Sequence, residues 1–114
     1  MTTAYNATTA AERSDRTQHP NHLLRRARLR LPSPRNSDRP MSRQELAEAV
    51  NAHVFDAIGR LVSMDAHYVG RLERGQRRWP GADYRSGLRA VLGVATDAEI
   101  GFYLTRRTAS DEKS

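Results

Sequence analysis

The sequence predicts an all-α fold of five helices. Apolar residues recur at steps of three and four in five short segments, which is the period of a helix with one buried face. Polar residues that start helices precede several of these segments, and glycine or proline follows them. The chain has 114 residues, which is enough for one domain with its own core.

This domain is expected to span residues 21–105. Residues 1–20 are polar and carry no sustained apolar period, and residues 106–114 have the same character. We therefore expect a disordered N-terminal arm before the domain and a disordered tail after it.

The first helix is expected in the sequence NHLLRRARLRL, which begins at Asn21. Its leucines and alanine fall on one helical face, and its arginines are assigned to the other face. The sequence that follows, PSPRNSDRP, contains three prolines and therefore ends the helix.

The second helix is expected from Arg43 to Ile58. Ser42 and Glu45 form a capping-box pattern, in which each side chain bonds a free backbone amide of the first turn. Apolar residues then recur with helical spacing, and Gly59 follows them. An alternative interpretation ends this helix earlier and makes VFDAIGRLV a small hairpin that turns at Gly59.

Three further helices are expected. The third occupies about residues 65–74, with Asp65 as its N-cap and Gly75 as its stop. The fourth lies in ADYRSGLRAVLG. The fifth lies in TDAEIGFYL, which opens with a second capping box made by Thr96 and Glu99.

The charge of the chain favours a polyanionic partner. The formal net charge is +6, and residues 21–43 hold seven arginines against one acidic residue, Asp38. The chain has a single lysine, Lys113, and so strong a preference for arginine also follows from a GC-rich genome. Arginine content alone therefore implies no ligand.

Several classes of function are not supported by the sequence. The chain has no cysteine, and its four histidines lack metal-ligand spacing, so no metal site is expected. No apolar run approaches the roughly 20 residues of a membrane-spanning helix, and no secretory signal is present. We therefore expect a cytoplasmic protein that does not associate with a membrane. We find no phosphate-binding glycine loop, no paired carboxylates and no Ser/His/Asp grouping, so neither catalytic residues nor a cofactor are expected.

The order of the elements and three sequences within them resemble a known family. The sequences are SRQELAEAV, DAHYVGRLERG and QRRWPG. They resemble the helix-turn-helix domains of the lambdoid phage repressors and their bacterial relatives, the xenobiotic-response-element (XRE) family, and more narrowly a set of regulators common in actinobacteria. The resemblance covers about Leu23 to Leu104 and implies a five-helix lambda-repressor-like domain. This chain departs from the family pattern in the extra sequence VFDAIGRLVS, which extends the segment between the two motif helices.

The resemblance implies a transcriptional regulator that binds double-stranded DNA in a sequence-specific manner. The recognition helix, about residues 65–74, would enter the major groove. The positions that match the family's base readers are Ala66, His67, Gly70 and Arg71. The positions placed for phosphates are Ser42, Arg43, Arg74, Arg77 and Arg78.

Two acidic residues are assigned structural roles. Glu73 is expected to pair with a nearby arginine or a helix end rather than to act as a catalytic acid. The family pattern also implies a bridge between Glu45 and one of the arginines in residues 25–30.

The resemblance further implies a homodimer on a two-fold related operator. The expected dimer interface is Ile100, Phe102, Tyr103 and Leu104, which offer more apolar surface than one inward helical face would use. A second hypothesis is a protein-interaction module that uses the same scaffold to bind a sigma factor, a toxin or another regulator. Its contact surface would be residues 54–64.

Overall fold

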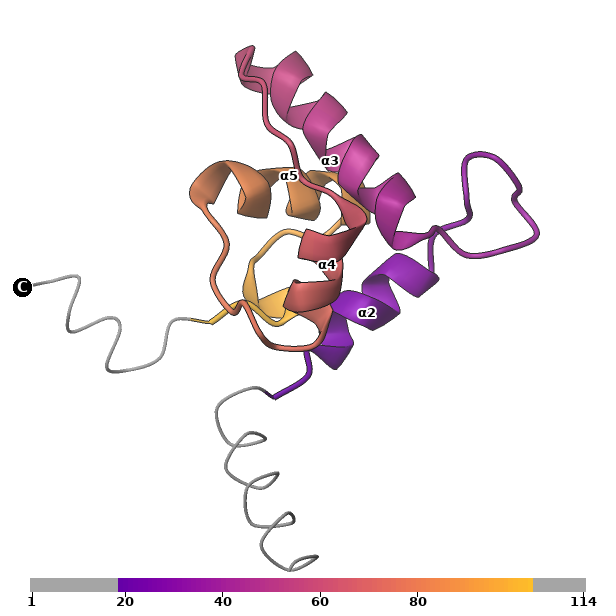
Figure 1. The fold of residues 1–114 in the computed structure, drawn as a ribbon, viewed down its shortest axis with the longest axis vertical. Helices are drawn as coiled ribbons and strands as arrows, with labels where there is room; N and C mark the ends of the chain where they lie inside the picture. Colours follow the sequence, from indigo (N-terminus) through magenta and orange to yellow (C-terminus); the bar gives the residue numbers. More distant parts are fainter. Residues whose placement is uncertain (1–18, 104–114) are drawn as a thin grey trace, which may run out of the picture.

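The computed structural model describes residues 19–103 of the 114-residue chain. Within that range the fold is all-α and contains no β-strand (Figure 1). Its elements are the helices α2 (His22–Leu29), α3 (Arg43–Ile58), α4 (Ala66–Glu73) and α5 (Ala82–Leu92), and a short 3-10 helix, η1 (Ala98–Ile100). The expected tail, and all but the last two residues of the expected arm, lie outside the described residues.

Helix α2 is short, and its buried face includes a charged residue. The Asn21 side chain caps the helix by accepting a hydrogen bond from the Leu24 amide (3.0 Å). Leu24 and Ala27 face the core, and Arg28 is buried beside them. The assignment of every α2 arginine to the solvent face is therefore wrong for Arg28. The helix ends at Leu29, before the proline-rich sequence.

Helix α3 is central to the fold and is continuous to Ile58. The predicted capping box forms, because Ser42 and Glu45 each accept a hydrogen bond from the other's amide. Gly59 ends the helix at φ 68°, and its amide donates to the Phe55 carbonyl (2.8 Å). The hairpin alternative is therefore wrong. Helix α3 packs against both α4 and α5.

Helix α5 crosses α3 at close range. A Cβ atom placed on Gly87 would lie 2.8 Å from Cγ1 of Val50, so a glycine is what allows this approach. Leu88 and Leu92 of α5 are buried beside the contact. The core that results combines side chains of the four described α-helices with Met41 and Met64 from the connections and with Ile100 and Phe102 from the C-terminal segment.

The C-terminal segment folds differently from the expected fifth helix. Thr96 and Glu99 form the predicted capping contacts, in which the Glu99 carboxylate accepts from the Thr96 amide (2.8 Å). Only the 3-10 turn of η1 follows, because Gly101 adopts φ 79° and redirects the chain. Ile100 and Phe102 are then buried in the core. No α-helix forms over residues 96–103, so the prediction of a fifth α-helix is wrong.

This burial also corrects the expected dimer interface. Ile100 and Phe102 are 0% and 2% exposed within their own chain, and the Asn21 side chain donates to the Ile100 carbonyl (2.9 Å). Neither side chain can reach a second copy unless the segment leaves the core. Of the other two residues, Tyr103 is 59% exposed, and Leu104 lies outside the described residues.

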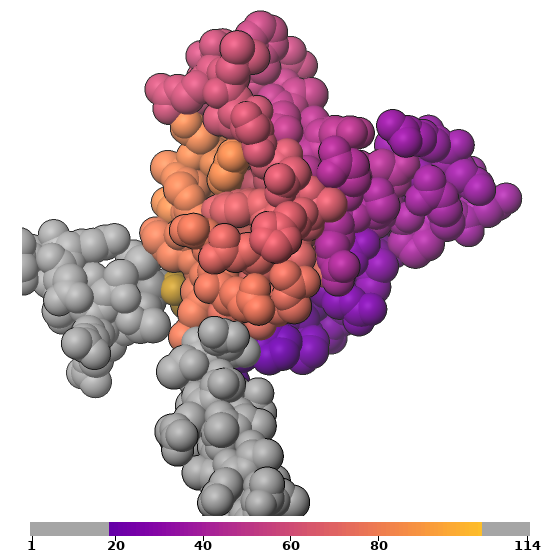
Figure 2. Space-filling model, viewed as in Figure 1, coloured from indigo at the N-terminus to yellow at the C-terminus, as the bar shows by residue number. Residues whose placement is uncertain are grey.

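Three exposed apolar side chains lie at the end of α3 and in the segment that follows it. Phe55, Ile58 and Leu61 are 51%, 55% and 85% exposed, and together they are termed the apolar prominence. In Figure 1 the last turns of α3 and the connection to α4 project beyond α5, and Figure 2 shows the same projection at the top of the molecule. The prominence stands apart from the packed core.

Candidate nucleic-acid interface

Helix α4 is held by its ends and by its buried face. The Asp65 side chain caps it by accepting a hydrogen bond from the Tyr68 amide (2.8 Å). Val69 and Leu72 are fully buried against the core. At the other end Gly75 adopts φ 81°, where the LERG sequence predicts the stop. The rest of the helix surface carries the predicted base readers.

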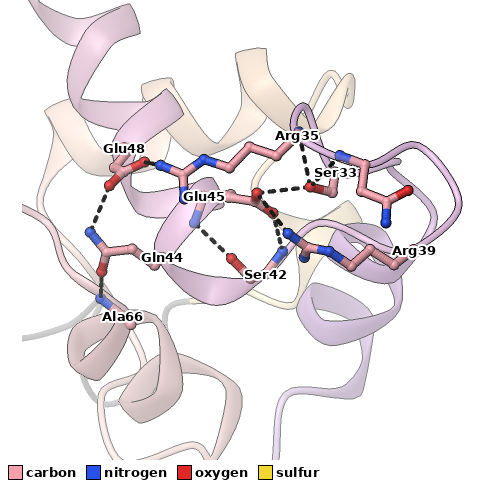
Figure 3. A network of polar contacts seen from close by, with 9 residues as sticks. Ser33, Arg35, Arg39, Ser42, Gln44, Glu45, Glu48 and Ala66 are labelled. Atoms are coloured by element: carbon pink, nitrogen blue, oxygen red, sulfur yellow. Dashed lines mark hydrogen bonds and ion pairs between the residues drawn. The ribbon is translucent and has the colours of Figure 1, made fainter.

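Two side chains of α3 fix the position at which α4 begins. Gln44 accepts a hydrogen bond from the Ala66 amide (3.1 Å) and donates to Glu48 (3.0 Å), as Figure 3 shows. Asn51 donates to the Met64 carbonyl and accepts from the Met64 amide, both at 2.9 Å. Sequence reasoning missed Gln44 and Asn51, because a polar residue inside a helix gives no sign of the distant backbone group that it bonds.

An open basic groove lies between α2 and the N-terminal ends of α3 and α4. Its described lining includes no carboxylate. Six of the predicted DNA-contact residues line it, namely Ser42, Arg43, Ala66, His67, Gly70 and Arg74. Its remaining lining residues are Arg25, Arg28 and Gln44. The fold thus gathers four arginines around the exposed surface of α4's first turns.

The Arg74 side chain packs over Gly70 on the wall of the groove. Gly70 is buried, and a Cβ atom placed on it would lie 2.9 Å from Nη1 of Arg74. The Arg74 guanidinium therefore lies over the position where other helices carry a side chain. This arrangement corrects the assignment of Gly70 as a base-contacting residue, because the arginine covers it.

Three predicted contact residues lie outside this groove. Arg71 follows His67 by one turn of α4 and is partly buried. The Arg77 guanidinium lies over the Tyr68 ring, 5.6 Å from its centroid. Arg77 and Arg78 line a separate hollow between the start of α2 and the loop after α4. The groove therefore brings together most, but not all, of the predicted site.

A buried carboxylate holds two of the groove's arginines. Glu73, whose side chain is 2% exposed, accepts hydrogen bonds from Nε and Nη2 of Arg28 at 2.6 and 3.1 Å. It also accepts from Nε of Arg43 at 3.0 Å. Arg28 donates further to the Met41 carbonyl (2.8 Å). The expected structural role of Glu73 is confirmed, because it ties α2, α3 and α4 together behind the groove.

Glu45 has partners other than the expected arginine of residues 25–30. Figure 3 shows its carboxylate with the Ser42 amide (2.9 Å), the Ser33 hydroxyl (2.8 Å) and the Arg39 guanidinium (3.4 Å). The Ser42 amide first, and then the Ser33 hydroxyl, lower the pKa of Glu45 from 4.5 to about 2. Because the Ser42 amide donates to Glu45, only the Ser42 hydroxyl is left for the predicted phosphate contact of this residue.

Comparison with known proteins found no matching family model, no matching curated protein and no matching solved structure. Within residues 19–103 no helix is long and apolar enough to cross a membrane. Among the same residues no group of three or more His, Cys, Asp or Glu side chains is placed to hold a metal ion. The geometry of the groove is therefore the evidence on which a function can be argued.

Proposed function

We propose that the chain is a sequence-specific DNA-binding transcriptional regulator of the lambda-repressor-like XRE kind. The observation that carries this proposal is the groove beside α4, whose lining contains four arginines and no carboxylate. Arg28 and Arg43 pair with Glu73 behind the groove, whereas Arg25 and Arg74 add positive charge that this carboxylate does not balance. A concave surface of this charge suits the phosphates of a duplex. An α-helix with its side chains is about 10–12 Å in diameter, and B-DNA's major groove is about 12 Å wide, so a helix such as α4 can enter it.

In this proposal α4 is the recognition helix. His67, which is exposed in its first turn, donates to a purine N7, and Ala66 packs against a thymine methyl group. Arg71 bonds guanine O6 and N7, a contact worth about 1–3 kcal/mol of discrimination. Arg43 and Arg74 bind phosphates, and Arg25 on the opposite wall of the groove joins them.

A homodimer on a two-fold related operator is part of the proposal. One module of this size rarely supplies enough contacts for specific binding by itself. Because Ile100 and Phe102 are buried, the second copy meets a surface that does not include them. Sedimentation of the chain with an operator duplex measures the stoichiometry: two chains per duplex are expected, and one chain per duplex at saturation contradicts the dimer.

The proposed function is tested by selection from a random duplex library at two salt concentrations. We expect an inverted repeat for the wild-type chain, and loss of preference at one position of each half-site for Arg71→Ala. Arg60→Ala is the matched control, because it removes the same charge from the connection after α3, where Arg60 pairs with Asp83. Weak binding without sequence preference by the wild-type chain contradicts the proposal.

The apolar prominence favours a second candidate function, a protein-interaction module. Its side chains are too exposed to support the core, and a sigma factor, a toxin or another regulator would cover them. Binding of such a partner depends on Phe55 and Leu61 and tolerates salt, whereas DNA binding falls steeply with salt. A Phe55→Ser/Leu61→Ser chain that keeps the DNA selection but loses a partner captured by the wild type supports this function. Equal capture by both chains contradicts it.

A further inference from the structure

The loop between α2 and α3 is a second projection of the molecule (Figures 1 and 2). Its two ends run side by side, since the Met41 amide donates to the Leu31 carbonyl (2.8 Å) and the Ser33 amide donates to the Arg39 carbonyl (2.9 Å). An isolated β-bridge joins the two prolines at these ends. Residues 32–40 are termed the arginine loop.

A buried serine holds the arginine loop in one shape. The Ser33 hydroxyl oxygen, in a residue that is 3% exposed, accepts hydrogen bonds from the amides of Arg35 (3.1 Å) and Asn36 (3.3 Å). The same hydroxyl donates to the Glu45 carboxylate (2.8 Å; Figure 3). Three prolines restrict the loop backbone further. The loop is therefore ordered before it meets a partner, which lowers the entropy lost on binding.

The arginine loop carries two exposed arginines and one acidic residue, Asp38. The side chains of Arg35 and Arg39 are 74% and 46% exposed. Two carboxylates of α3 lie beside them, Glu48 at 3.9 Å from Arg35 and Glu45 at 3.4 Å from Arg39. The contact between Arg35 and Glu48 joins two exposed side chains and is weak, so Arg35 remains available to a stronger anion.

The arginine loop and the recognition helix are joined along one side of α3. Arg35 lies beside Glu48, and Glu48 accepts a hydrogen bond from Gln44. Gln44 in turn accepts from the Ala66 amide at the start of α4, so Figure 3 shows a polar path from the loop to that helix. Arg28, which lines the groove, also donates to the backbone at the base of the loop. The loop is therefore connected to the wall of the groove through Gln44, with the Glu48 carboxylate between Arg35 and Gln44.

We propose that the arginine loop is a second DNA-contacting element, in which Arg35 and Arg39 bind backbone phosphates that flank the site read by α4. This inference rests on the proposed function, because it places the loop against the same duplex. The contact is to the sugar-phosphate backbone, so it adds affinity and fixes orientation without reading sequence. Its ligand is a pair of duplex phosphates outside the recognised half-site.

The test measures how binding to one duplex, the one selected by the wild-type chain, depends on salt. It compares the wild-type chain with Arg35→Gln and with Arg35→Gln/Arg39→Gln. Each lost phosphate contact reduces the salt slope of binding by about 0.9, so the affinity drop between about 50 and about 200 mM salt shrinks by about 3.5-fold per contact. The double variant is expected to show about a 12-fold smaller drop than the wild type. Arg60→Gln on the connection after α3 removes one charge without touching the loop and is the control.

Two readouts separate this inference from the proposed function. Ethylation of phosphates is expected to interfere with wild-type binding at positions flanking the half-site, and this interference disappears in the double variant while base preference is unchanged. If the wild type selects an operator but Arg35→Gln and Arg60→Gln have the same salt slope and the same interference pattern as the wild type, the loop inference is overturned and the regulator stands. If the wild type selects no sequence, both fail.

Discussion

The ion pair between Arg28 and Glu73 leads to a quantitative prediction, because the same carboxylate also pairs with Arg43. The Arg28 side chain is 8% exposed and the Arg43 side chain is 43% exposed. Breaking a buried pair by removing one partner costs about 3–5 kcal/mol, whereas an exposed pair contributes about 0.2–1 kcal/mol. Arg43 stays beside the carboxylate when Arg28 is replaced, so we expect the lower end of the buried range. Arg28→Gln is therefore expected to cost about 3 kcal/mol, and Arg43→Gln less than about 1 kcal/mol.

These costs are measurable against the stability of a small domain. At roughly 0.05–0.15 kcal/mol per residue, the described part of the chain has a net stability on the order of 4–13 kcal/mol. A loss of about 3 kcal/mol lowers Tm by about 12–24 °C for a domain of this size. Thermal unfolding followed by far-ultraviolet circular dichroism gives Tm, and urea titration gives the free energy of unfolding for each variant.

A third variant separates the cost of leaving a buried charge unpaired from the cost of lost side-chain packing. Arg28→Met/Glu73→Leu replaces the buried pair by apolar groups and is expected to be within about 1 kcal/mol of the wild type, since such replacements are often neutral. Equal costs for Arg28→Gln and Arg43→Gln would refute the claim that burial sets the strength of this junction. So would a double variant that is no more stable than Arg28→Gln.

Three further predictions concern packing, protonation and the groove. Gly87→Ala brings a methyl group 2.8 Å from a side-chain carbon of α3 and is expected to lower the free energy of unfolding in urea by about 1–3 kcal/mol. The control Ser86→Ala, on the exposed face of α5, is expected to change it by about 0.5 kcal/mol or less, and equal losses for the two variants would contradict the close crossing. The pKa of Glu45 is about 2 instead of 4.5, so its stabilising contribution is complete above pH 4.5 and is lost as the pH falls toward 2. Glu45→Gln is expected to flatten the plot of unfolding free energy against pH in this range, and an unchanged slope would count against the role of Glu45. Gly70→Ala displaces the Arg74 guanidinium and is expected to weaken DNA binding by about tenfold, or about 1.4 kcal/mol, in a mobility-shift assay, while Tm stays nearly unchanged. An unaltered affinity for DNA would show that Arg74 does not need to lie over Gly70.

The helix boundaries that could be predicted from the sequence depend on short-range bonds. Ser42 and Glu45 are three residues apart, and their capping contacts form as their spacing predicts. Thr96 and Glu99 form the same contacts, yet no α-helix follows them. Burial of Phe102 requires the chain to turn after η1, and this tertiary demand overrides the local helix signal. A capping pattern predicts where a helix can start but not whether it continues.

The contacts that hold the site together are long-range, and only part of them left a trace in the sequence. Arg28 follows Leu24 by four residues, and Glu73 follows Val69 by four, so both charges occupy core-facing positions of their helices. Opposite charges at two inward positions were a usable sign of a buried pair. The bond from Gln44 to the α4 backbone had no such sign, because its partner is an amide rather than a side chain.

The position of α4 is not set by the length of the connection between α3 and α4. Gln44 and Asn51 hold Ala66 and Met64, both at the far end of the connection. Within residues 59–63, Val62 packs against the core and Arg60 pairs with Asp83, so Gly59 precedes these contacts. The entropy of closing such a loop rises slowly, by about 0.6 kcal/mol for each doubling of its length. A peptide tag inserted after Gly59 should leave the basic groove in place. The same tolerance gives chains of this fold a position at which they can lengthen, so the number of residues between α3 and α4 is a poor measure of how alike two such folds are.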